Sequence, residues 1–124
     1  MSKRIAAALG LLLAMAAGEA ALAGKADVVA ATARRGGDGL WRFEVTVRHA
    51  DSGWEHYADA YEVLSPDGTL LGRRVLAHPH ENEQPFTRSL SGVRVPPSVR
   101  RVHIRAHDKV HGWGGNEVII DLPR

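Results

Sequence analysis

Two histidines on either side of a proline mark the most chemically distinctive stretch of this sequence, residues 76–91 (LAHPHENEQPFTRSLS). His78 and His80 are two residues apart, and in extended backbone side chains at this spacing leave on the same face. We therefore expect the two imidazoles to lie close enough to share one ion. Glu81 and Glu83 follow them, whereas a loop that only turns the chain is usually built from Gly, Asn, Asp and Ser. This composition indicates a functional loop.

Two other loops, residues 49–56 and 107–115, carry the same kinds of side chain. Each combines imidazole, carboxylate and indole groups within nine residues or fewer. Neutral imidazole suits copper(II), zinc, nickel and iron(II). A nearby carboxylate often accepts the other ring N–H of a ligating histidine and so orients it. The three loops together therefore favour a metal site with nitrogen ligands and acidic residues behind them.

The absence of sulfur narrows the chemistry of such a site. The sequence has no cysteine, and both methionines, Met1 and Met15, precede residue 24. Thiolate nucleophiles, blue-copper centres and iron–sulfur clusters are thereby excluded from the rest of the chain. We predict a copper(II) or zinc(II) site. Its predicted ligands are His78, His80, His107, His111 and His56. Its predicted orienting or contact residues are Glu81, Glu83, Asp108, Asp51, Trp113 and Trp54.

Seven segments have the composition of short strands, and turn residues separate them. The pattern is clearest in residues 40–48, where apolar and polar residues alternate strictly, as in a strand with one buried face. His49 continues the buried face and is expected at the edge of the core. The predicted strands are 28–34, 40–48, 57–64, 69–76, 86–93, 99–107 and 117–122, with no helix. They predict an all-β, seven-stranded antiparallel two-sheet sandwich, immunoglobulin-like or fibronectin-type-III-like; a small barrel is the alternative.

Strand alternation predicts where the histidine loops lie. Successive strands of such a sandwich run in opposite directions, so the connections after the second, fourth and sixth strands share one pole. Those connections are the three loops described above, and they contain six of the seven histidines. The remaining one, His103, is expected on the exposed face of a strand. The sequence therefore predicts one polar pole with indole side chains beside it.

The N-terminus has the pattern of a signal peptide, with a basic start, an apolar run over residues 5–17 and a small-x-small motif at Ala21-Leu22-Ala23. We predict a signal peptide over residues 1–23 and a single domain over 24–124, periplasmic or secreted, with no membrane span after cleavage. Removing Lys3, Arg4 and Glu19 leaves a formal net charge of +1. A charge so close to zero argues against nucleic acid as a partner.

Two other functions compete with metal binding. The same pole could bind a protein, a peptide or a carbohydrate, because Trp54, Trp113, Tyr57 and Phe86 supply stacking and contact surface. Hydrolysis is disfavoured, because no serine lies in a glycine-flanked nucleophile turn. We therefore predict no catalytic residues and favour a binding protein over an enzyme.

The runs HPHENEQPFTRSLSG and RAHDKVHGWGG resemble small exported bacterial β-sandwich proteins of uncharacterised function. The resemblance covers most of the chain after residue 23. It implies an exported sandwich fold and no particular activity. Both runs belong to loops that strand alternation places at one pole.

Overall fold

The computed structural model describes residues 24–124 and contains only strands as regular elements in that part of the chain. The strands are β1 (Asp27–Arg35), β2 (Trp41–Arg48), β3 (Ala58–Leu64), β4 (Leu70–Val75), β5 (Phe86–Val93), β6 (Arg101–Asp108) and β7 (Val118–Asp121). They form two antiparallel sheets with the orders β1-β2-β5 and β4-β3-β6-β7. The predicted all-β two-sheet sandwich is therefore confirmed, and each predicted strand lies within two residues of an observed one. The signal-peptide prediction falls outside the described residues.

Alternating apolar residues of β2, β3 and β6 make the core between the sheets. β2 buries every second residue, and its apolar side chains are almost fully shielded from solvent. Tyr61 of β3 donates a hydrogen bond from its hydroxyl group to the backbone oxygen of Arg88, which ties the two sheets together. The fully buried apolar side chains include Trp41, Phe43, Val45, Val47, Tyr61, Val63, Val102 and Ile104. Residues 24–124 contain no helix long and apolar enough to cross a membrane.

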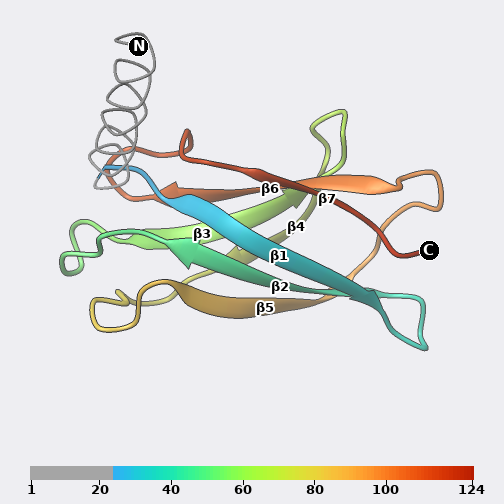
Figure 1. Ribbon diagram of the computed structural model, residues 1–124, viewed down its shortest axis with the longest axis horizontal. Coiled ribbons are helices and arrows are strands. Elements are labelled where there is room, and N and C mark those ends of the chain that lie inside the picture. The colour runs from blue at the N-terminus through green and yellow to red at the C-terminus, as the bar shows by residue number, and fades with distance from the viewer. Residues whose placement is uncertain (1–23) are drawn as a thin grey trace, which may run out of the picture.

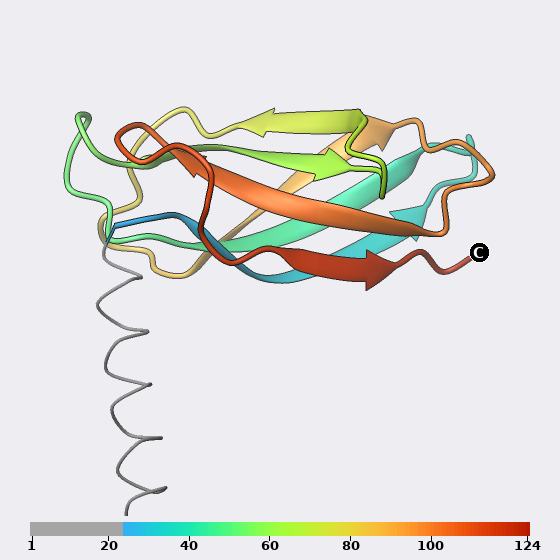
Figure 2. The same ribbon diagram turned by 90° about the horizontal axis from the view of Figure 1, so that it is seen from above.

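The three histidine-containing loops lie together at one end of the sandwich, as strand alternation predicts. Figure 1 shows the β2–β3, β4–β5 and β6–β7 loops at the left end and the other connections at the right, near the C-terminus. The view from above shows the same separation (Figure 2). His103 lies on β6 and pairs with Leu64 and Ile119, outside these loops. The strands therefore bring three segments that are distant in sequence to one pole.

Candidate metal centre

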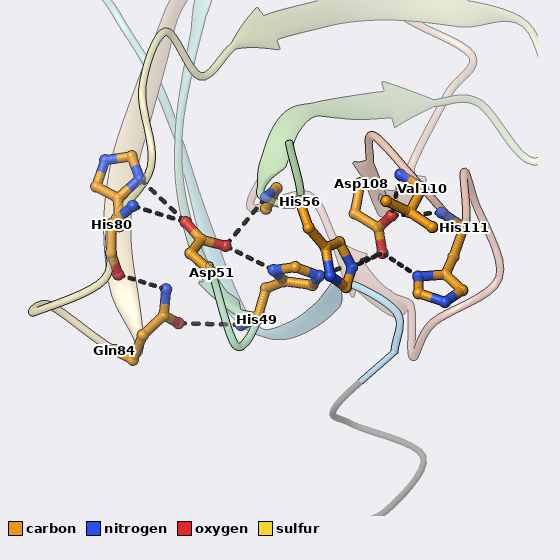
Figure 3. A network of polar contacts seen from close by, with 9 residues as sticks. His49, Asp51, His56, His80, Gln84, Asp108, Val110 and His111 are labelled. Carbon is orange, nitrogen blue, oxygen red and sulfur yellow. Dashed lines mark hydrogen bonds and ion pairs between the residues drawn. The ribbon is translucent and has the colours of Figure 1, made fainter. Parts of the chain in front are cut away.

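Asp108, the last residue of β6, lies at the middle of a histidine cluster (Figure 3). Its Oδ2 atom is 3.2 Å from His49 Nε2, 3.1 Å from His111 Nδ1 and 3.7 Å from His56 Nε2. The Asp108 side chain is fully buried. One carboxylate oxygen therefore meets an imidazole nitrogen from each of three positions on two loops.

Backbone hydrogen bonds hold the Asp108 carboxylate in place. Its Oδ1 atom accepts the backbone N–H groups of Val110 and His111. Burial alone would raise the pKa of Asp108, but these bonds, the His111 side chain and the nearby His49 outweigh burial and lower the pKa below its ordinary value. Asp108 is therefore ionised at neutral pH and can act as an anionic ligand.

His49 follows β2 directly and points inward because it continues the buried face of that strand. Its Nδ1–H group donates to Asp51 Oδ1 at 2.6 Å, since a carboxylate can only accept. In the neutral ring this bond leaves the lone pair on Nε2, the atom that faces Asp108. The expectation that His49 lies at the edge of the core is confirmed, with 1% of the residue exposed. Its position beside Asp108 was not predicted from the sequence.

Asp51 anchors His49 and also joins two of the loops. Besides His49 Nδ1, its carboxylate accepts the backbone N–H of Ala58 at 3.1 Å and that of His80 at 2.6 Å. Gln84 adds a parallel link, accepting the N–H of His49 and donating to the oxygen of His80 (Figure 3). The imidazole that Asp51 contacts, and could orient as the sequence predicts, is that of His49.

Three members of the cluster have donor atoms close enough to surround one ion, and His111 contacts the third of them, Asp108. His49, His56 and Asp108 each place one donor atom within 4.8 Å of the others. Ligand atoms at 2.0–2.1 Å from a tetrahedral zinc ion lie about 3.3 Å apart, close to the 3.1–3.7 Å found around Asp108 Oδ2. His49 Nε2 and His56 Nε2 are buried and have no hydrogen-bond partner among the described residues. Buried polar atoms rarely stay unpaired, and a cation between them would satisfy both.

His78 and His80 meet each other but do not join the Asp108 cluster. Their ring centroids are 4.5 Å apart at a tilt of 35°. The His80 ring stacks on Phe86 at 3.9 Å and is buried, with neither ring nitrogen bonded. Burial, followed by the charge of Arg88, lowers the pKa of His80 and keeps the ring neutral.

His107 forms a separate group on the outer face of the four-stranded sheet. Its Nδ1–H group donates to Asp59 Oδ1 at 2.6 Å, and its ring meets Trp113 edge-on at 4.8 Å. Asp59 occupies an irregularity in the β3–β6 pairing, between Ala58 and Ala60. The sequence did not single out Asp59, because a bulge that re-aims a side chain is invisible in strict strand alternation.

The other predicted contact residues lie around the same pole. Glu83 pairs with Arg88 at 3.0 Å, and that bond lowers the pKa of the Glu83 carboxyl group. Glu81 is exposed and lines a hollow of about 400 Å³ with the histidines of the β4–β5 loop. Trp54 is 63% exposed and packs edge-on against Tyr57. The five predicted ligands thus divide into His56 and His111 at Asp108, His78 and His80 at the β4–β5 loop, and His107 at Asp59.

The structure is an all-β sandwich with one polar pole, and the comparisons with known proteins identify one relative in sequence and one in fold. No family model matches the chain. A protein described as "Putative lipoprotein" from Halomicrobium mukohataei is 40% identical over 97 residues, which are 78% of this chain and 47% of that protein. The chain therefore spans about half the length of this curated relative. The crystal structure of hypothetical protein PH1083 from Pyrococcus horikoshii OT3 superposes with a TM-score of 0.52 at 20% identity, covering 79% of this chain and 88% of that one.

Proposed function

We propose that this chain is an exported protein that binds one divalent transition-metal ion, zinc(II) or copper(II), at Asp108, His49, His56 and His111. The observation that carries the proposal is the meeting of three imidazole nitrogens at Asp108 Oδ2, two of them buried and without a hydrogen-bond partner. The ligand set contains only nitrogen and oxygen, which suits both ions. The signal-peptide pattern and the name of the Halomicrobium mukohataei relative support export, to the periplasm or beyond.

Titration of untagged, metal-free protein with zinc chloride and copper sulfate, followed by calorimetry, tests this proposal. We expect one ion per chain in the wild type. Replacing both His56 and His111 with alanine is expected to weaken binding at least tenfold, by analogy with the loss of ligand-orienting groups. His103→Ala is the matched control, because that histidine lies outside the polar pole. Equal affinities for the wild type and the double variant would refute the proposal.

A second candidate function is recognition of a protein, peptide or carbohydrate by the same pole without metal. Its support is the exposure of Trp54, at 63%, beside the loops that carry the histidines. Exposed aromatic residues are common centres of binding surfaces. Under this function the wild type would take up neither zinc nor copper, and Trp54→Ala would abolish partner binding while leaving the fold intact.

A further inference from the structure

The four residues of the proposed metal centre divide into a pair with fully buried side chains and a pair with partly exposed side chains. The side chains of His49 and Asp108 are fully buried. The side chains of His56 and His111 are 23% and 37% exposed. An ion at Asp108 Oδ2 would thus have the buried pair on one side and the partly exposed rings of His56 and His111 between it and solvent on the other.

The buried pair is held by bonds that need no ion. Asp51 and Gln84 fix the ring and the backbone of His49, and two backbone N–H groups fix the Asp108 carboxylate. These bonds also join the loops to one another, because Asp51 reaches the backbone of His80. The apolar core between the sheets contains none of the four proposed ligands. The proposed site therefore differs from structural zinc sites, whose four ligands are closed around the ion and supply folding energy.

His56 and His111 make up the partly exposed pair. His56 stands 3.7 Å from Asp108 Oδ2, the longest of the three approaches, and its Nε2 atom makes no hydrogen bond. His111 follows Val110, which is 60% exposed, and is held by a turn in which Asp108 and Gly112 exchange backbone hydrogen bonds. Outward rotation of either partly exposed ring would open the ion position to an incoming donor group, which could then replace one imidazole at a time.

We infer that the bound ion is exchangeable and passes to and from small oxygen- or nitrogen-donor chelators by ligand exchange at the His56 and His111 side. This inference rests on the proposed metal site and assigns it a role, the reversible uptake and release of the ion. His49 and Asp108 retain the ion while a chelator atom takes the place of His56 or His111. The chain then serves metal uptake or delivery rather than metal-dependent folding.

Transfer of zinc from the loaded protein to 4-(2-pyridylazo)resorcinol, followed by absorbance in a stopped-flow instrument, tests the inference. Ligand exchange predicts a rate constant proportional to chelator concentration, so a tenfold rise in chelator gives about a tenfold rise in rate. His111→Ala is expected to accelerate transfer, and His103→Ala is expected to leave it unchanged. A transfer rate that does not depend on chelator concentration would overturn the inference while leaving the metal site intact. A wild type that takes up no zinc would instead refute the proposed function itself.

Discussion

Replacing Asp51 with asparagine tests the proposed metal centre while all four proposed ligands are kept, because Asp51 contacts the ring of His49. The Asp51 side chain is fully buried and accepts three hydrogen bonds, from the His49 ring and from the backbone N–H groups of Ala58 and His80. Asparagine has nearly the same shape but one acceptor oxygen and an NH₂ group. Two of the three donors can share the remaining oxygen, and the third then faces another donor.

Two effects on different quantities, the stability of the metal-free protein and its affinity for zinc, follow from this substitution. A buried donor left without an acceptor costs about 1–3 kcal/mol, so the free energy of unfolding of the metal-free protein should fall by that amount. The His49 ring also loses the negative charge behind Nδ1, which makes Nε2 a weaker donor. Loss of such an orienting carboxylate usually lowers metal affinity about 10- to 100-fold, equivalent to about 1.4–2.8 kcal/mol.

Urea denaturation and zinc calorimetry on the same preparation separate these effects. The matched control is Asp121→Asn, because that carboxylate is 78% exposed and only pairs with Arg101 on the surface. It should change stability by less than about 1 kcal/mol and leave zinc affinity unaltered. A folded Asp51→Asn protein that binds zinc as tightly as the wild type would show that Asp51 does not orient a ligand.

Three further predictions concern the frame around the site. Gly115→Ala should lower the melting temperature sharply, because a Cβ atom there would lie 1.9 Å from the backbone oxygen of Ala26, whereas Gly37→Ala, with open space around it, should be nearly neutral. Glu62→Gln should lower the free energy of unfolding, measured by urea denaturation, by about 2 kcal/mol, because the buried carboxylate forms ion pairs with two partly exposed arginines. His80 has a lowered pKa in the folded state, so its contribution to stability is complete above pH 6.5 and is lost as pH falls below that value. Unfolding free energies measured from pH 7.5 to 5 should therefore decline less in His80→Phe than in the wild type.

The sequence was sufficient to predict the sandwich and the gathering of the histidine loops. Period-two alternation located β2 and β6, and the up-and-down order of strands placed three distant loops at one pole. These features depend on backbone direction and on which face is apolar, and both can be read from residue types.

The grouping of the imidazoles could not be predicted in the same way. The spacing of His78 and His80 predicts that their rings lie close together, as they do, but it does not predict that the ring of His80 stacks on Phe86. The prediction that His49 lies at the edge of the core is confirmed, yet its partner Asp108 lies 59 residues further along the chain, at the end of β6, and strand alternation does not predict this contact. Strand alternation predicts only which end of the sandwich a loop occupies. Metal ligation requires donor atoms to be placed within a few tenths of an ångström.

Charge balance at the pole links the fold to the proposed chemistry. Asp51 and Asp108 are both fully buried, and within residues 24–124 their ion-pair partners are histidines alone, with no lysine or arginine. Two buried carboxylates are costly unless positive charge compensates them. The divalent ion proposed beside Asp108 would supply positive charge to this pair of carboxylates. The sandwich thus places two buried carboxylates, with histidines as their ion-pair partners, where the proposed divalent cation would balance their negative charge.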